Sequence, residues 1–477
     1  MDSEIGLFEN IMSKNSIHPI EERYQTVDMA KLFTQSAKLY RWLRVEAALA
    51  QAHASIGDIP QDAADEISKK ATLNFVKIKR VLEIEHKIHH DLMAMVKGLT
   101  EQCEGTAGNY IHLGATSYDI EDTATAIQLT QAFFILNDSI TKVLTLLIQL
   151  AEEHKNHLCV GRTHGQQALP TTYGMRFAVW ACEMARHLDR IRDLLPRIAV
   201  GKMSGAVGTM ASFGEKGFKI QEIVMEILAK EFQIPLRAVI VANQIVQRDR
   251  HAEAINLTGL IAGTIDKIAR EMRILQRTEI GEMFEPFTKS QVGSSTMPHK
   301  RNPHKAERLC SLVRVIKSNL VVGIDNIGLE DERDLTNSAN ERIIFAENFI
   351  LLDYMLSQLS QILEGLEFNE EAIERNLNFT HGAFLAERIM VALVDKGIGR
   401  QTGHELLRTA AIESRQKHDS MKSILLANPE INSRFSEEEI NNLLDSKQYL
   451  GMAIPQVEQA ISFIKSNYIL DDNHREI

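Results

Sequence analysis

The hydrophobic positions of the chain repeat with the period of an α-helix over much of its length. From Ala124 onward, apolar residues recur mostly every three or four positions, which places them on one helix face: Ile127, Phe133, Leu136, Ile140, Val143, Leu147 and Leu150. Three neighbouring apolar residues widen this stripe: Phe134, Leu144 and Ile148. We therefore expect a long helix that is buried on more than one side.

The same period predicts four more long helices, over residues 172–199, 243–279, 304–328 and 335–365. The polar–apolar alternation of a strand is nearly absent, apart from short apolar runs such as residues 237–242. Only 10 prolines and 26 glycines interrupt the 477 residues, which leaves room for long helices. The pattern predicts an all-α fold with a central bundle of long helices, flanked by smaller N- and C-terminal helical domains.

The pattern changes near residue 370, where shorter helical segments broken by polar turns begin. We therefore expect an N-terminal helical domain over residues 1–115, a central long-helix bundle over 116–368 and a C-terminal helical domain over 369–477. A chain of this length is large enough for more than one domain.

Composition places the chain among soluble globular proteins, with 44% hydrophobic and 25% charged residues. The formal net charge of −11 argues against a general nucleic-acid-binding protein, which would present a basic surface. No apolar run is long enough to span a bilayer, and the acidic N-terminus MDSEIGLFEN lacks the pattern of a signal sequence.

Four cysteines are scattered along the chain without a CxxC pair: Cys103, Cys159, Cys182 and Cys310. We therefore expect neither disulfides nor a cysteine metal site, and a reducing cytoplasmic location.

Polar or glycine-rich loops separate the predicted helices. Ser117 or Asp119 is expected to cap the first long helix. Loops at the ends of long, rigid helices are where chemistry is usually placed. The loops expected here cover residues 112–122, 161–174, 201–217 and 293–308.

Residues 293–308, GSSTMPHKRNPHKAER, gather positive charge in an acidic chain. Two prolines prevent one continuous helix, and four basic residues accompany a single acid, Glu307. A solvated basic loop is the usual interpretation of such charge. The Gly-Ser-Ser turn and the close spacing of Lys300 and Asn302 favour a loop that delivers several donors to one anionic ligand.

A second group of donors follows in ERDLTNSANER, residues 332–342. It contains Arg333, Ser338 and Arg342, and the last two are four residues apart on one helix face. Arginine and serine on one face suit a carboxylate or a phosphate.

Histidine is the other candidate for chemistry, although a surface or core role is the ordinary interpretation of any single one. His154 and His157 are three residues apart, but neither an HExxH pattern nor cysteines support them, so we expect no metal site. His164 lies between Gly161 and Gly165 on a tight loop. It suits acid–base catalysis, because histidine ionises near neutral pH.

The glycine-rich segment GKMSGAVGT, residues 201–209, lacks the GxxxxGK[ST] spacing of a P-loop, and no predicted strand precedes it to form a dinucleotide-binding unit. Two interpretations remain open: a plain interhelical turn, or a loop whose backbone N–H groups contact an anion. The residues alone therefore indicate a helical enzyme for an anion-rich substrate, with a candidate histidine acid and a candidate serine, but do not specify the reaction.

GSSTMPHKRNP resembles the signature loop, GSSxMPxKxN, of the fumarase/aspartase superfamily, whose members eliminate fumarate from succinyl compounds. LGATSYDIEDTA, residues 113–124, and GAVGT, residues 205–209, resemble two other shared blocks of that superfamily. The resemblance runs in order from about Glu22 to about Gly365. Residues 370–477 carry no motif that we can match.

Within the superfamily, four segments resemble the branch that cleaves succinylated purine nucleotides: EERYQTVDM near the N-terminus, GRTHGQQALPTTYG, NQIVQRDRHAE and RDLTNSANERI. The resemblance implies elimination of fumarate from a phosphorylated, succinylated purine nucleotide, with no metal or organic cofactor.

The resemblance also implies residue roles, with Ser294 as general base and His164 as general acid. His112 is implied as a supporting residue. His89 stands where many members have Arg, so an anion contact there is weaker. The implied substrate-binding residues are Arg23, Tyr24, His89, His90, Asp91, His112, Thr116, Ser117, Gln244, Lys300, Asn302, Arg308, Arg333, Ser338 and Arg342.

One chain is not expected to complete this site. Residues 112–122 and 161–174 lie at opposite ends of a helix of ~30 residues, hence ~45 Å apart at 1.5 Å per residue. The resemblance implies a homotetramer whose sites are shared among three chains.

Two alternatives remain. Another superfamily member, such as a carboxymuconate cycloisomerase or an argininosuccinate lyase, is opposed by the Arg23–Tyr24 pair and the 333–343 block. A structural protein on the same fold, as in lens crystallins, is opposed by the presence of both Ser294 and His164.

Overall fold

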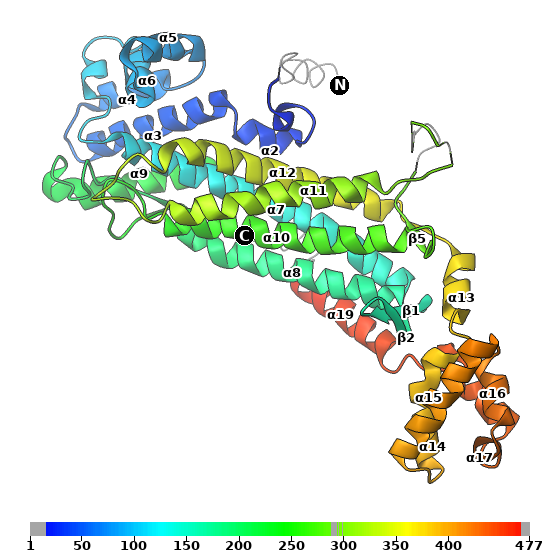
Figure 1. The fold of residues 1–477 in the computed structure, drawn as a ribbon. Helices are drawn as coiled ribbons and strands as arrows, with labels where there is room; N and C mark the ends of the chain where they lie inside the picture. The colour runs from blue at the N-terminus through cyan, green and yellow to red at the C-terminus, as the bar shows by residue number, and fades with distance from the viewer. Residues whose placement is uncertain (1–15, 288–292, 294, 298, 469–477) are drawn as a thin grey trace. The chain divides into compact units, whose positions relative to one another are not determined.

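The computed structural model describes residues 16–287, 293, 295–297 and 299–468. Helices dominate the described chain, as predicted (Figure 1). The α-helices are α2 (Val27–Leu32), α3 (Gln35–Ser55), α4 (Gln61–Lys70), α5 (Ile78–Ile88), α6 (Asp91–Thr100), α7 (Ser117–Glu153), α8 (Tyr173–Ile198), α9 (Gly217–Phe232), α10 (Asp249–Leu275), α11 (His304–Asp325), α12 (Ser338–Glu364), α13 (Glu370–Asn378), α14 (Ala386–Asp395), α15 (Arg400–Lys417), α16 (Met421–Ala427), α17 (Pro429–Asn432), α18 (Glu437–Leu443) and α19 (Ala453–Tyr468).

The short elements are 3₁₀ turns and paired strands. The 3₁₀ turns are η1 (Pro19–Glu21), η2 (Ala107–Tyr110), η3 (Gly214–Lys216), η4 (Ala383–Leu385) and η5 (Ser446–Gln448). The strands are β1 (Leu158–Thr163), β2 (Gln166–Thr172), β3 (Val200–Gly201), β4 (Arg237–Ala238), β5 (Met283–Phe284) and β6 (Glu367–Phe368). They pair as β1 with β2 and β5 with β6, both antiparallel, and as β3 with β4, parallel.

The five long helices predicted from the apolar period are confirmed as α7, α8, α10, α11 and α12. Within α7 the predicted stripe is fully buried at Phe133, Leu136 and Ile140, and Leu144 beside the stripe is also buried. The N-terminal boundary differs from the prediction: α7 begins at Ser117 itself, so the capping position falls on Thr116.

By length and composition alone, α7 is also long and apolar enough to cross a membrane. The core helix of a water-soluble bundle passes the same test. The stripe residues from Ile127 to Leu147 are buried, which favours this second interpretation.

The described chain divides into two compact units. Unit 1 comprises residues 1–140, 187–265 and 311–357, and unit 2 comprises residues 141–186, 266–310 and 358–477. The long helices contribute residues to both units. The three-domain division expected from the sequence stays a prediction.

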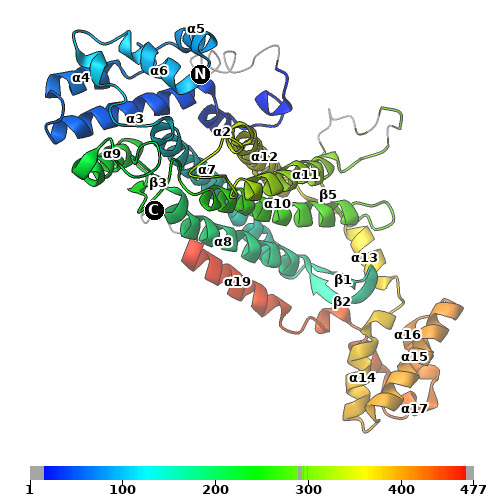
Figure 2. The ribbon, with the colours of Figure 1, turned by 60° about the vertical axis from the view of Figure 1, so that its left-hand side comes forward.

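Unit 1 holds the N-terminal helices, in which α3 packs on α4 and α9, and α5 packs on α6 (Figures 1 and 2). Buried polar groups join the long helices here. The amide of Asn348 on α12 donates to Thr258 Oγ1 on α10 at 2.9 Å, and Asn319 on α11 donates to Asn348 at 2.8 Å.

A buried charge network also joins three helices of unit 1. The guanidinium of Arg248, the residue before α10, donates to Asp122 on α7 and to Glu341 on α12. Burial opposes ionisation of Glu341, but the charge of Arg248 outweighs it and lowers the pKa of Glu341 to about 2. This network fixes the first turn of α12, which begins with Ser338 and precedes Arg342.

Unit 2 contains the C-terminal helices α13 to α18, which are short, as the change of pattern near residue 370 predicted. They have a core of their own, which includes Leu393, Leu407, Met421, Leu425 and Ile431.

The segment 161–174, expected as a loop between helices, is instead the hairpin β1–β2. His164 and Gly165 form its two-residue turn with φ values of 53° and 73°, which match a type I′ turn. The prediction was wrong because the polar–apolar alternation of the two strands is interrupted. Gly161 and Pro170 break the pattern, and the strand register shifts between Val160 and Arg162.

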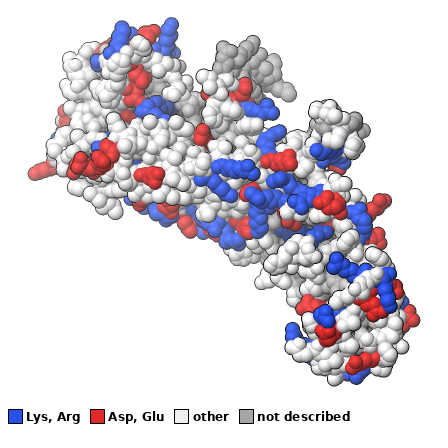
Figure 3. All heavy atoms as spheres, viewed as in Figure 1, with Lys and Arg blue, Asp and Glu red and all other residues white. Residues whose placement is uncertain are grey.

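Figure 3 shows that Lys and Arg side chains gather over the long helices on one face, so the charge of this acidic chain is unevenly distributed.

Candidate active site

The N-terminus of α7 is held by a buried carboxylate. Asp119 accepts hydrogen bonds from the backbone N–H groups of Thr116 at 2.8 Å, Ser204 at 2.9 Å and Gly205 at 3.1 Å, and its partner Lys202 is fully buried. The two loops at residues 112–122 and 201–217 are thereby joined. The N–H groups of Ser204 and Gly205 do bind an anion, but it is the chain's own Asp119.

Tyr118 connects three of the predicted substrate-binding residues. Its hydroxyl donates to Ser338 Oγ at 3.0 Å, and Arg333 lies with its Cζ 3.6 Å from the centre of the Tyr118 ring. Arg333 Nη1 also donates to Gln244 Oε1 at 3.1 Å. Burial, and then the charge of Glu121, raise the pKa of Tyr118 to about 12, so the phenol stays protonated and can donate.

Two donor atoms of Arg333, Nε and Nη2, are buried and have no hydrogen-bond partner among the described residues. Buried donors are almost always satisfied, by protein, water or ligand. An oxyanion bound beside Tyr118 would supply the acceptors that Arg333 lacks.

Arg342 lies on the same face of α12, one turn after Ser338. Its Nη2 donates to Asp91 Oδ2 at 2.8 Å, and Asp91 also lies 3.8 Å from Lys38 Nζ. Burial would raise the pKa of Asp91, but Arg342 and then Lys38 outweigh it and lower the pKa. Asp91 is therefore an ionised partner that orients the half-exposed Arg342.

Other predicted site residues of unit 1 contact neighbours other than Arg333 and Ser338. His112 has φ 62° and its Nδ1 lies 2.7 Å from Oε1 of the buried Glu46. Burial disfavours the imidazolium, but the hydrogen bond to Glu46 outweighs it and raises the pKa of His112. His112 is thus fixed in orientation by Glu46.

His90 caps α6, and His89 ends α5 in a left-handed conformation with its side chain exposed. The rings of Tyr24 and of Tyr354 on α12 contact each other at an angle of 57° with centres 5.5 Å apart, and the Arg23 guanidinium lies 5.7 Å from the centre of the Tyr24 ring. His90 Nδ1 lies 3.9 Å from Asp91 Oδ1.

Unit 2 contains His164, the predicted general acid. His164 is exposed at the tip of the β1–β2 hairpin, two residues beyond Arg162. Glu282, itself buried, accepts hydrogen bonds from Arg162 Nη1 at 3.3 Å and Nη2 at 2.5 Å, from the Tyr173 hydroxyl at 2.7 Å and from Asn376 at 2.8 Å. This carboxylate anchors the base of the hairpin that presents His164.

The segment that precedes α11 is closed at both ends by hydrogen bonds. Asn302 Nδ2 donates to the carbonyl of Gly293 at 2.9 Å, and a Cβ on residue 293 would lie 2.3 Å from the carbonyl oxygen of Lys300, so only glycine fits. The buried carboxylate of Glu285 accepts from the N–H groups of Lys305 and Ala306 and caps α11.

Ser294, the predicted general base, lies outside the described residues. Lys300, later in the same segment, is exposed. The Asn302 side chain is hydrogen-bonded to the carbonyl of Gly293, and Arg308 lies in the second turn of α11. Among the residues that the structure describes, no group of three or more His, Cys, Asp or Glu could hold a metal ion.

The structure thus brings together Gln244, Arg333, Ser338, Arg342 and Asp91 in unit 1, which also holds Arg23, Tyr24, His89, His90, His112, Thr116 and Ser117. Unit 2 holds His164, Lys300, Asn302 and Arg308. Sequence reasoning named Asp119 only as a candidate helix cap, and it missed the other residues that organise these groups: Lys38, Glu46, Tyr118, Glu121 and Glu282. The position of Tyr118 and Glu121 inside the LGATSYDIED block was the only available signal.

Glu282 gives a prediction for stability. Burial opposes its ionisation, but the hydrogen bonds from Arg162 and Tyr173 outweigh it and lower the pKa of Glu282. Glu282→Ala leaves the mostly buried Arg162 without its counter-charge, and we expect a loss of about 3–5 kcal/mol from the free energy of unfolding. Thermal and urea unfolding measure it. Exposed Glu279→Ala is the control, and equal losses in both variants would contradict the anchoring role.

Comparison with known proteins identifies the family of the chain. A sequence model of the family described as Lyase matches residues 22–317, and one described as Adenylosuccinate lyase C-terminus matches residues 382–460. The second match covers the region in which we recognised no motif.

Curated relatives match almost end to end. The adenylosuccinate lyases of Methanocaldococcus jannaschii and Methanothermobacter thermautotrophicus are each 48% identical, covering 95% and 94% of this chain and 97% and 98% of their own. N-acetyl-S-(2-succino)cysteine lyase of Dickeya dadantii is 36% identical, covering 94% of this chain and 97% of its own.

Among solved structures, the 3-carboxy-cis,cis-muconate lactonizing enzyme of Pseudomonas putida has a TM-score of 0.83 and 31% identity, covering 94% of this chain and 98% of its own. The fold is therefore that of the superfamily that the loop GSSTMPHKRNP indicated. The chain belongs to the adenylosuccinate lyase family of the fumarase/aspartase superfamily.

Proposed function

We propose that this protein eliminates fumarate from adenylosuccinate, giving AMP, and from succinylaminoimidazole carboxamide ribotide, giving the carboxamide ribotide. The observation that carries the proposal is the 48% identity to curated adenylosuccinate lyases over nearly the whole of both chains. Arg333, with two unsatisfied donors beside Tyr118, supports an anionic substrate.

In the proposed reaction, Ser294 removes a proton from the carbon beside one carboxylate of the succinyl group. The resulting aci-carboxylate carries extra negative charge, which cations and N–H donors stabilise more in the transition state than in the substrate. The carbon–nitrogen bond then breaks, its electron pair goes to the nitrogen, and His164 protonates that nitrogen. Fumarate and the purine nucleotide leave.

A serine hydroxyl is a weak base unless its alkoxide is stabilised, and Lys300 is the proposed source of that stabilisation. His112 supports the site through its fixed orientation. The remaining proposed substrate contacts are Arg23, Tyr24, His89, His90, Asp91, Thr116, Ser117, Gln244, Asn302, Arg308, Arg333, Ser338 and Arg342.

The proposed assembly is a cytoplasmic homotetramer with sites shared among three chains. The proposal of shared sites rests on the order of the elements in the sequence: α7, with 37 residues and hence ~55 Å long at 1.5 Å per residue, stands between residues 112–122 and the hairpin that carries His164. We infer that one substrate takes these two groups from different chains.

A thioether substrate is the second candidate, because the Dickeya dadantii relative is named for a succinylated cysteine. The two are distinguished by ultraviolet assays of the purified protein with adenylosuccinate and with N-acetyl-S-(2-succino)cysteine. We expect turnover of the nucleotide with release of fumarate and AMP in equal amounts. Turnover of the cysteine derivative alone would overturn the proposal.

A further inference from the structure

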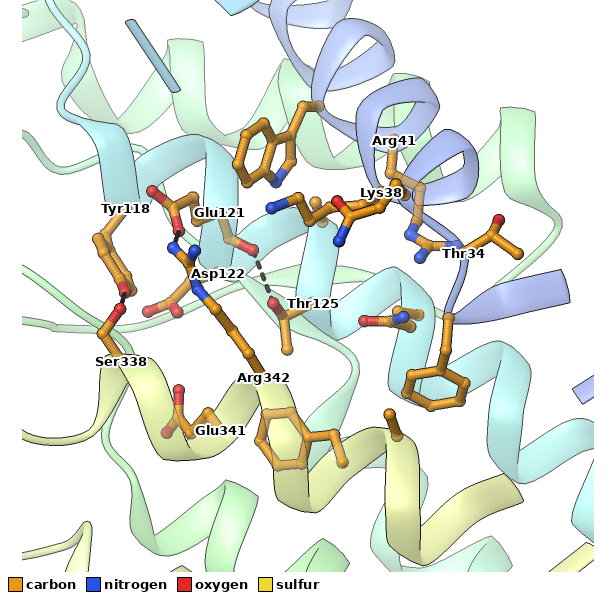
Figure 4. Close-up of a pocket in the computed structure, with 17 residues that line it drawn as sticks. Thr34, Lys38, Arg41, Tyr118, Glu121, Asp122, Thr125, Ser338, Glu341 and Arg342 are labelled. Atoms are coloured by element: carbon orange, nitrogen blue, oxygen red, sulfur yellow. Dashed lines mark hydrogen bonds and ion pairs between the residues drawn. The ribbon is translucent and has the colours of Figure 1, made fainter. Parts of the chain in front are cut away.

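Glu121 on α7 is a buried carboxyl group beside the proposed substrate contacts, and the family resemblance gives it no role. It lines a pocket of unit 1 with a volume of about 180 Å³, formed by residues of α3, α7 and α12 (Figure 4). The Glu121 side chain is only 13% exposed. The same pocket is lined by Ser338 and Arg342, so it adjoins the proposed site.

Four ionisable groups from four helices lie close together here, and three of them, Lys38, Glu121 and Arg342, line the pocket. Arg342 Nη2 lies 2.8 Å from Asp91 Oδ2 and 3.9 Å from Glu121 Oε2, and Figure 4 shows Glu121 and Arg342 pointing toward each other. Lys38 Nζ, on α3, lies 3.8 Å from Asp91 Oδ2. Asp122, the next residue on α7, is neutralised by Arg248, and Glu85 on α5 acts on Lys38.

The protonation of Glu121 decides the net charge of this cluster. With Arg342 and Lys38 positive and Asp91 negative, a neutral Glu121 leaves a net charge of about +1, whereas an ionised Glu121 leaves about 0. Only the state with a neutral Glu121 and a net positive charge favours binding of an anion. Asp91 already orients Arg342 through a direct hydrogen bond, so a second ionised carboxylate is not needed for orientation.

We propose that Glu121 is a positioning residue that acts through Arg342, and that its protonated form keeps the Arg342 cluster positive for an anionic oxygen group of the substrate. The ligand chemistry is a carboxylate or a phosphate. The inference rests on the proposed function. Arg342 remains half exposed and can reach such a group while its other side contacts Asp91 and Glu121.

The electrostatic surroundings support this state near neutral pH. Burial, and then the negative charge of Asp91, raise the pKa of Glu121 to about 8. Burial, and then the charge of Arg342, lower the pKa of Lys38 from its ordinary value. Glu121 is therefore mostly neutral at pH 7 and mostly ionised at pH 9.

The test compares wild type with Glu121→Gln, which keeps the shape but cannot ionise. For wild type, KM for adenylosuccinate should rise about three- to tenfold from pH 7 to pH 9, because one positive charge beside the ligand is cancelled. In Glu121→Gln the KM should stay level over this range. Asp138→Asn, an exposed carboxylate on the same helix, is the control and should follow wild type.

Parallel KM profiles in wild type and Glu121→Gln would overturn the proposal, and so would a KM that is raised equally at every pH in the variant. These outcomes are read from KM, whereas the pH dependence of the serine and histidine chemistry is read from kcat.

A second measurement needs no substrate. A carboxyl whose folded-state pKa is raised makes the fold lose stability as pH rises from about 4.5 to about 8. The melting temperature of wild type should therefore fall relative to that of Glu121→Gln over this range. If the difference in melting temperature between wild type and Glu121→Gln stayed the same at every pH, the inference would be overturned. Because this measurement involves no turnover, its outcome does not depend on the proposed function.

Discussion

Ser294→Ala should lower kcat for adenylosuccinate by at least about 10²–10⁴, the usual contribution of one acid–base group. The substitution removes the hydroxyl that is proposed to take the proton from carbon, and leaves the substrate contacts in place. KM, or the affinity measured by calorimetry, should therefore change little.

Ser295→Ala is the matched control, because it removes the neighbouring hydroxyl from the same loop. Ser295 is exposed, with its Oγ 3.5 Å from Thr296 Oγ1. We expect the control to retain most of the wild-type rate. If Ser294→Ala turned over substrate near the wild-type rate, or if the control were the inactive variant, the base would be a different residue.

His164→Gln should abolish turnover while the substrate still binds. Glutamine can keep a hydrogen bond at the hairpin tip, but it cannot deliver a proton to the leaving nitrogen at neutral pH. Steady-state kinetics with binding measured separately will distinguish loss of chemistry from loss of affinity. The control is His404→Gln, an exposed histidine on α15.

The wild-type rate should also fall toward both low and high pH, since base and acid must hold opposite protonation states. A flat profile from pH 6 to 9, with product release excluded as the slow step by single-turnover kinetics, would contradict the pair.

The long helices were predictable because each buries a continuous apolar stripe with the helical period, as in α7. The hairpin β1–β2 was not, because its strands are short, contain Gly161 and Pro170, and turn at His164–Gly165 rather than at a common Asn-Gly pair. The spacing of apolar residues within one segment is enough to predict a long amphipathic helix. A two-stranded hairpin depends on hydrogen-bonded pairing between two segments, which the spacing of apolar residues shows only weakly.

The same contrast applies to the site. Motif spacing identified Ser338 and Arg342 as groups on one helix face, and the structure joins them to Tyr118 and Asp91. The orienting contacts of Asp119 with Ser204 and Gly205 link residues 85 and 86 positions apart, and no spacing rule predicts them. A sequence read locally shows which side chains carry chemistry, but not which buried partners hold them in place.

The central claim is that a base and an acid from different chains act on one substrate. Its most direct measurement is to mix the two inactive variants, Ser294→Ala and His164→Gln, under conditions that allow subunit exchange, with exchange followed by mass or fluorescence. If the two groups come from different chains, some mixed sites contain both wild-type residues, and adenylosuccinate cleavage should return to roughly a quarter of the wild-type rate in an equal mixture. No recovery despite proven exchange would show that Ser294 and His164 come from one chain, and would contradict the account.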